Sequence, residues 1–190
     1  TGEVLQRYAA GLRSDPLRLA STTPHARLLR WLTQQDQAIA FDFWRARMQG
    51  VVNPTDLNLP PAEGPSSGEV HLDVVQEDFR FVERCARDLR LTLNTVVQGA
   101  WALLLMRLNG RSDVVFGATV SGRPSDVPGV ESIVGMCINT LPIAVHARSG
   151  ITTVEWLREL QSELSAVQGF AQVPLSELQA LSALGPSQSL

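Results

Sequence analysis

The chain has 190 residues, of which 44% are apolar and 18% are charged. This composition supplies a buried core for about one domain and excludes an intrinsically disordered chain. The formal net charge of −3 excludes a strongly basic surface for nucleic acid or anionic lipid. All 16 cationic side chains are arginines, so lysine chemistry such as a Schiff base or a P-loop is also excluded.

The first residues and the two cysteines indicate whether the chain is part of a longer one and in which compartment it lies. The sequence begins at Thr1 without a signal peptide, and we expect it to be a piece of a longer chain. No apolar run approaches the about 20 residues of a membrane span, so we expect no membrane partner. Cys85 and Cys137 lie in apolar runs without metal-binding spacing, which predicts two buried thiols in a reducing, cytoplasmic compartment.

Helical periodicity dominates the first 50 residues. It predicts a short helix over residues 2–13 and helical structure over 25–48, with Asp36 as an N-cap between two segments. Residues 51–68 contain four prolines together with glycines, serines and asparagines. Such a stretch forms neither a helix nor a central strand, so it is predicted to be a connector.

After the connector, residues 69–75 alternate between apolar and polar side chains, which predicts a strand. An amphipathic helix is predicted over residues 77–90. Its inward side chains are expected to be Phe81, Val82, Cys85 and Leu89.

The clearest predicted helix covers residues 93–108 and ends at Asn109 and Gly110. Its apolar residues recur at helical spacing and are expected to face the core. This stripe consists of Leu93, Val96, Val97, Ala100, Trp101, Leu104, Leu105 and Leu108.

The last third of the chain completes an α/β pattern. Continuous apolar runs over residues 113–120 and 138–147 predict strands. Thr152 and Glu155 fit a capping box that opens a helix over residues 153–168, and a short helix is predicted within 173–181. We therefore expect helices packed on a mixed β-sheet.

The histidines do not form a catalytic or metal-binding pattern. His25, His71 and His146 are widely separated, and no carboxylate accompanies them at a fixed offset. The chain also contains no G-x-G-x-x-G motif. The sequence therefore predicts no complete catalytic site and no metal site within this chain.

The run of residues 117–142 is the strongest candidate for a functional site. Its glycines permit close approach of the backbone to a ligand or another strand. Arg123 offers a fixed fork of donors, and Asn139 offers an amide donor and a carbonyl acceptor. Two interpretations remain open: a tight structural loop in which Asn139 binds the backbone, or a polar edge that contacts a substrate.

This region resembles the condensation domains of nonribosomal peptide synthetases. Residues 134–142, VGMCINTLP, are similar to the family's V-G-x-F-x-N-T-L-P run. Four further stretches resemble the family in the same order along the chain. They are residues 28–50, 91–117, 113–124 and 172–179, the last of which is similar to the family's H-Q-D-x-P-F-E region.

The resemblance implies a two-lobed fold similar to chloramphenicol acetyltransferase, of which this chain is mainly the second lobe. Residues 1–50 are then linking helices, 51–68 the connector and 69–190 the C-terminal subdomain. The family's catalytic signature, H-H-x-x-x-D-G, is absent from the chain, so no catalytic residue is assigned here. Residues that line or support the cleft are expected to be Ser121, Arg123, Gly135, Asn139 and Thr140.

The resemblance also implies a reaction and its partners. The amine of one carrier-bound aminoacyl thioester attacks a second carrier-bound acyl or peptidyl thioester, and an amide bond forms. The expected partners are carrier protein domains with phosphopantetheine arms as tethers, the N-terminal half of the same domain and an adenylation domain, with no directly bound cofactor.

Two departures, Gln172 in place of a frequent His and Met136-Cys137 in place of an aromatic pair, keep alternatives open. These are a stand-alone or ester-forming acyltransferase and a non-catalytic module that docks carrier proteins.

Overall fold

The structure is a computed structural model that describes residues 22–51, 53–57 and 68–183. The helix expected over residues 2–13 and most of the connector lie outside the described residues. The chain divides into two compact units, which are described separately. The smaller unit comprises Thr1–Gln35 with Arg123–Cys137, and the larger unit comprises Asp36–Gly122 with Ile138–Leu190.

The smaller unit contains helix α2 (His25–Thr33) and a single 3-10 turn, η1 (Val130–Ser132). Its buried side chains are Leu28, Val127, Val130 and Ile133. Thr23 joins the two chain segments of this unit by an isolated parallel bridge to Ile133 and by a hydroxyl–hydroxyl contact of 2.8 Å to Ser132. The helical structure that is described within residues 123–137 is this one short turn, of three residues.

The larger unit contains two strands, β1 (Asp113–Val120) and β2 (Asn139–His146), both at the predicted places. They pair antiparallel, from Asp113 opposite His146 to Val120 opposite Asn139. Among the described residues the expected mixed sheet is thus an antiparallel pair. At Gly117, a Cβ atom would lie 2.8 Å from Thr140 Cγ2, which explains a glycine in mid-strand.

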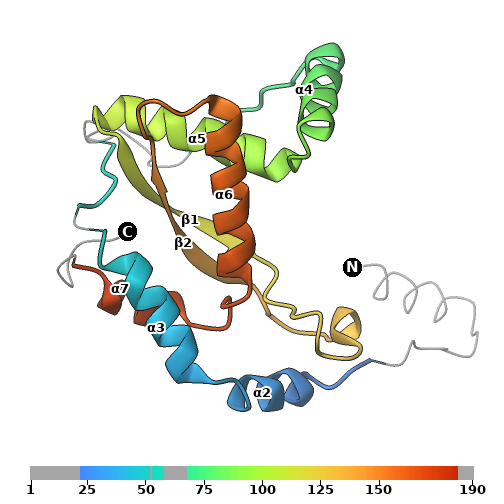
Figure 1. The fold of residues 1–190 in the computed structure, drawn as a ribbon. Coiled ribbons are helices and arrows are strands. Elements are labelled where there is room, and N and C mark those ends of the chain that lie inside the picture. Colours follow the sequence, from blue (N-terminus) through green and yellow to red (C-terminus); the bar gives the residue numbers. More distant parts are fainter. Residues whose placement is uncertain (1–21, 52, 58–67, 184–190) are drawn as a thin grey trace, which may run out of the picture. The chain divides into compact units, whose positions relative to one another are not determined.

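Among the described residues of the larger unit, five helices accompany this sheet (Figure 1). They are α3 (Gln37–Met48), α4 (Gln76–Asp88), α5 (Leu93–Asn109), α6 (Thr153–Gln168) and α7 (Leu175–Leu181). None of the described helices alone is long and apolar enough to span a membrane. Only α4 and α5 together meet that criterion, as a pair bent by 107°.

The predicted helix boundaries are confirmed by their caps. The Asp36 carboxylate accepts hydrogen bonds from the first backbone N–H groups of α3, at 2.9 and 3.2 Å. Gly110, with φ of 63°, ends α5 in the left-handed conformation. The capping box of Thr152 and Glu155 opens α6. Hydrogen bonds from the Thr152 backbone and hydroxyl group stabilise the Glu155 carboxylate, so they lower its pKa from the ordinary value.

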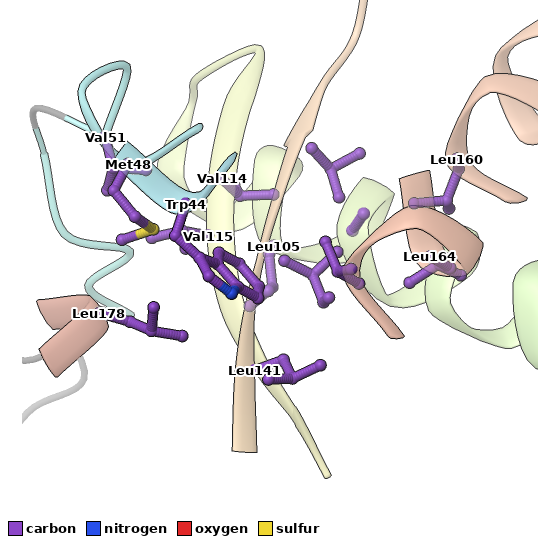
Figure 2. Close-up of a cluster of buried hydrophobic side chains, with 14 of the residues drawn as sticks. Trp44, Met48, Val51, Leu105, Val114, Val115, Leu141, Leu160, Leu164 and Leu178 are labelled. Atoms are coloured by element: carbon purple, nitrogen blue, oxygen red, sulfur yellow. The ribbon is translucent and has the colours of Figure 1, made fainter. Parts of the chain in front are cut away.

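The core of the larger unit lies between the sheet and the helices α3, α5, α6 and α7 (Figure 2). Trp44, on α3, is fully buried at 0% exposure and forms the centre of this cluster. The other labelled side chains of this cluster are Met48, Val51, Leu105, Val114, Val115, Leu141, Leu160, Leu164 and Leu178. Residues far apart in sequence therefore form one apolar core.

Most of the predicted face of α5 is wrong, although Leu105 is buried at 3% exposure as expected. Trp101 is 44% exposed, Val97 58% and Leu108 56%, although all three belong to the most apolar stripe of the helix. The buried positions are Thr95, Gly99, Ala102, Leu105 and Met106. The small residues among them allow close packing: a Cβ atom at Gly99 would lie 2.5 Å from a Leu157 methyl group of α6. The helix thus buries a face that combines small residues with Leu105 and Met106, and it exposes most of the large apolar side chains of the predicted stripe.

Three other expectations also fail. Residues 69–75 do not form a strand, because no neighbouring strand pairs with them in the described part of the chain. Phe81, expected inside, is 61% exposed on α4. Cys85 and Cys137 are free thiols as expected, but both are only partly buried.

Candidate functional site

Asn139 uses its side-chain amide to hold a distant loop. It is the first residue of β2, and its Nδ2 group donates hydrogen bonds to the carbonyl oxygens of Ala171 and Val173, at 2.7 and 2.8 Å. Its Oδ1 atom accepts a hydrogen bond of 2.9 Å from the backbone N–H of Thr140. Both amide hydrogens and one carbonyl lone pair are therefore engaged by the protein's own backbone.

The same loop is held from a second side by Trp44. The indole N–H of this buried residue donates a 2.9 Å hydrogen bond to the carbonyl oxygen of Phe170. The loop of residues 170–173, which connects α6 to α7, thus has three carbonyl groups fixed by side chains of α3 and β2. We call these three hydrogen bonds the loop clamp.

Ring and ion contacts reinforce the first position of the loop. The Phe170 ring stacks on Phe43, with centroids 4.0 Å apart and an interplanar angle of 26°. The Arg47 guanidinium lies 3.5 Å from the Phe43 ring centroid and forms two hydrogen bonds, of 2.6 and 3.1 Å, to the Glu163 carboxylate. These contacts connect α3 to α6 next to the loop clamp.

Arg123 also binds its own backbone surroundings. Its Nη1 group donates to the carbonyl oxygens of Val130 and Ile133, at 2.6 and 3.2 Å. These acceptors flank η1, so the guanidinium closes the loop of the smaller unit around that turn. Arg123 therefore donates as its guanidinium group predicts, and these two hydrogen bonds hold the protein's own backbone.

Gly135, in the smaller unit, is held in a backbone conformation that favours glycine. Its φ is 149°, and a Cβ atom there would lie 2.9 Å from His25 Cδ2. His25 begins α2, as the sequence predicts for a residue at a helix start. The glycine therefore allows the loop to approach the imidazole ring closely.

The five candidate residues divide between the two units. Ser121, Asn139 and Thr140 belong to the larger unit, whereas Arg123 and Gly135 belong to the smaller one. Ser121 is exposed directly after β1, and Thr140 pairs with Thr119 across the sheet. The hypothesis that Asn139 binds the backbone is confirmed: its side chain contacts two carbonyl groups of the 170–173 loop and the backbone N–H of Thr140.

The loop clamp joins two stretches that the sequence marks separately. Asn139 belongs to VGMCINTLP, and the loop begins the stretch before α7 that includes Gln172. Sequence reasoning did not identify Trp44 as the second donor. Its only signal was its place in the run of residues 28–50, which supplies no information about a partner 126 positions away.

Replacing Gly135 with alanine tests the close approach of the loop to His25. We expect a loss of about 1–3 kcal/mol in the free energy of unfolding, because the new Cβ strains the backbone and displaces the ring. Gly150→Ala is the matched control, since Gly150 also has a positive φ, of 87°, but no atom within 4 Å of the added Cβ. Chemical denaturation measures both variants. Equal losses would show that the contact with His25 contributes nothing.

Across residues 22–51, 53–57 and 68–183, no group of three or more His, Cys, Asp or Glu side chains could hold a metal ion. His146 ends β2, and His71 forms a 3.2 Å contact with Glu69 on the surface. The described histidines therefore form no cluster.

Comparison with known proteins extends the resemblance to the whole chain. The condensation domain family matches residues 1–190. One of the linear gramicidin synthase proteins of Brevibacillus parabrevis is 40% identical over 195 residues, which cover 100% of this chain and 4% of that protein. Chondramide synthase cmdD of Chondromyces crocatus is 36% identical over 181 residues, which cover 93% of this chain and 5% of that protein.

Solved structures confirm the fold class. The first condensation domain of the calcium-dependent antibiotic synthetase, in complex with a substrate analogue, matches with a TM-score of 0.74 and 19% identity. The match covers 96% of this chain and 41% of that chain. A structure named holo T3CT matches with a TM-score of 0.67 and 24% identity, covering 97% of this chain and 40% of that one.

The chain thus spans about 40% of the matched solved chains and only a few per cent of its curated relatives. Helices on a small sheet, matched over this share, correspond to one lobe of the expected two-lobed fold. On the family match and the 40% identity together, the chain belongs to the condensation domain family of nonribosomal peptide synthetases.

Proposed function

We propose that this chain is the second lobe of a condensation domain that forms an amide bond between two carrier-bound substrates. The observation that carries the proposal is the loop clamp, because it fixes the two family-like stretches against each other. Amide formation requires the amine and the thioester to be held in a near-attack geometry, and a rigid lobe contributes to that positioning. In this proposal, Asn139 and Arg123 support the cleft structurally and transfer no proton.

The proposed partners follow from the same reaction. They are carrier protein domains, whose phosphopantetheine arms present the two substrates, an adenylation domain, and an N-terminal half that supplies H-H-x-x-x-D-G. Two of the solved relatives are consistent with this setting, since one is described as holo and another holds a substrate analogue. We also propose a cytoplasmic location, where a multidomain synthetase meets its amino acid substrates.

A chimera tests the proposal directly. In the linear gramicidin synthase protein that is 40% identical, the matched segment is replaced by this chain, whose sequence aligns with it from end to end. Donor-loaded and acceptor-loaded carrier proteins are then added, and the dipeptidyl thioester is measured by mass spectrometry. We expect product from the chimera and none from residues 1–190 alone, because the isolated chain lacks the His-rich signature.

The controls separate catalysis from docking. The family resemblance implies an H-H-x-x-x-D-G motif in the recipient protein, and alanine in place of its second histidine should abolish product from the chimera. Product from residues 1–190 alone, at a rate near that of an intact domain, would refute the assignment. A folded chimera that binds carrier proteins without forming product would instead identify a non-catalytic docking module.

A further inference from the structure

Helix α5 is apolar on two opposite faces. Among its 17 residues, Arg107 alone is charged. One face, which includes Ala102 and Met106, packs into the core of the larger unit. A helix that is apolar all round is typical of an element that is covered on every side. The composition of α5 therefore indicates that a second surface packs against it.

The second face is a straight row of four large side chains, which we call the α5 ridge. It consists of Val97, Trp101, Leu104 and Leu108, which are 58%, 44%, 47% and 56% exposed. Their spacing of four, three and four residues places them one above another along the helix, opposite its buried face. At a rise of 1.5 Å per residue, the ridge is about 16 Å long.

Contiguity distinguishes the α5 ridge from ordinary exposed apolar residues. Single apolar side chains at the surface are normal, and Ile39 on α3, at 59% exposure, is one of them. Adjoining apolar side chains instead mark a surface at which another element or molecule packs. Removal of the ridge from water would stabilise the contact that covers it.

The comparisons indicate what covers the ridge. The first condensation domain of the calcium-dependent antibiotic synthetase matches 96% of this chain, but only 41% of that structure is matched. For holo T3CT the two shares are 97% and 40%. More than half of each solved structure therefore has no counterpart in this chain, and a domain of that size contains additional elements that can pack on α5.

We propose that the α5 ridge is an internal interface of the complete condensation domain, covered by the part of the same domain that this chain does not contain. The inference rests on the proposed function in placing the chain within a complete domain, but not on the amide-forming reaction. It also accounts for the apolar stripe that the sequence predicts to be buried. Most of this stripe is exposed in the single chain and buried in the complete domain.

Hydroxyl-radical footprinting with mass spectrometry measures the exposure of Trp101 in two settings. One is residues 1–190 alone, and the other is the gramicidin chimera, which contains the rest of the domain. Large apolar side chains in cores are commonly more than 95% buried, so the oxidation rate of Trp101 should fall about tenfold in the chimera. Ile39 is the matched control, and its rate should stay the same. Trp44, at 0% exposure, should be protected in both settings, which verifies folding.

A substitution in the ridge tests the contact itself. Leu104→Gln introduces an uncharged polar group with nearly the same helix propensity. In residues 1–190, where Leu104 is half-exposed, we expect the oxidation rate of Trp101 to stay the same. In the chimera we expect this rate to rise toward that of the single chain, because a buried amide without a hydrogen-bond partner weakens the interface. Ile39→Gln is the matched control and should leave Trp101 protected.

Equal oxidation of Trp101 in the two settings would overturn the proposal. Protection of Trp101 in residues 1–190 alone would also overturn it. If that protection grew with concentration, the occupant would be a second copy, and otherwise it would be another part of this chain. A chimera that forms product without protecting Trp101 would refute this inference and keep the proposed reaction. A chimera that protects Trp101 without forming product would do the reverse.

Discussion

Replacing Trp44 with alanine is expected to destabilise the larger unit by about 3–5 kcal/mol. The side chain is fully buried among α3, the sheet and α7, so its removal leaves a cavity in the centre of the core (Figure 2). The same change leaves the carbonyl oxygen of Phe170 without its 2.9 Å donor. Urea denaturation, followed by circular dichroism, measures the loss in the free energy of unfolding.

Two variants test which property of Trp44 matters. Trp44→Phe keeps an aromatic ring but removes the N–H group and part of the indole volume, so it tests the hydrogen bond together with a smaller cavity, and we expect it to cost about 1–3 kcal/mol. Trp101→Ala removes the same side chain from the exposed face of α5 and should cost less than about 1 kcal/mol. Equal losses in the free energy of unfolding for Trp44→Ala and Trp101→Ala would contradict the difference in burial between the two tryptophans.

The helix α5 shows what hydrophobic periodicity determines and what it does not. Periodicity and the final glycine predicted the start and end of this helix within a residue. They did not predict most of the buried face, because Leu105 is the only residue of the predicted apolar stripe that is buried in the core. Close helix packing selects small side chains such as Gly99 and Ala102. Packing of this kind depends on the residues of the neighbouring helix, so the sequence of α5 alone does not predict it.

The segment 69–75 illustrates the same limit for strands. Alternation predicts that a segment suits a pleated, half-buried position, but a strand also requires a neighbour for its hydrogen bonds. β1 and β2 satisfy both conditions because they pair with each other. Residues 69–75 satisfy only the first condition in the described chain, so their prediction as a strand is wrong here.

The candidate site was predicted in part. The residue types of 117–142 indicated that Asn139 and Arg123 make polar contacts, and both do so with backbone carbonyl groups. The partners of Asn139 lie 32 and 34 positions further along the chain. No local pattern predicts such a pairing, since it depends on how α6 returns the chain to the sheet.

Asn139→Asp is expected to be the most damaging single-atom change in the loop clamp. It replaces the donating Nδ2 group with a carboxylate oxygen, which then faces the carbonyl oxygens of Ala171 and Val173. Two acceptors lose their donor and a negative charge is placed beside them, so we expect a loss above about 3 kcal/mol at neutral pH. Asn139→Ala lacks the added charge and should lose about 2 kcal/mol. Asn94→Asp is the matched control, because the exposed Asn94 uses only its Oδ1 atom, as an acceptor from Gln98.

The pH dependence of the Asn139→Asp variant distinguishes a clamp from a mere packing role. Two facing carbonyl oxygens disfavour the charged carboxylate, so folding raises the pKa of the introduced group above its value in the unfolded chain. A raised pKa means that the folded state binds the proton more tightly, so the penalty is full at neutral pH and shrinks as pH falls. The protonated group also donates one hydrogen bond to the loop. We therefore expect the difference in unfolding free energy between the aspartate and alanine variants to narrow or reverse on acidification.

In the gramicidin chimera, Asn139→Ala should lower the condensation rate together with stability. A lower rate with unchanged stability would show instead that Asn139 contacts the substrates. In the stability experiment, a difference between Asn139→Asp and Asn139→Ala that does not change with pH would contradict the hydrogen bonds of the loop clamp.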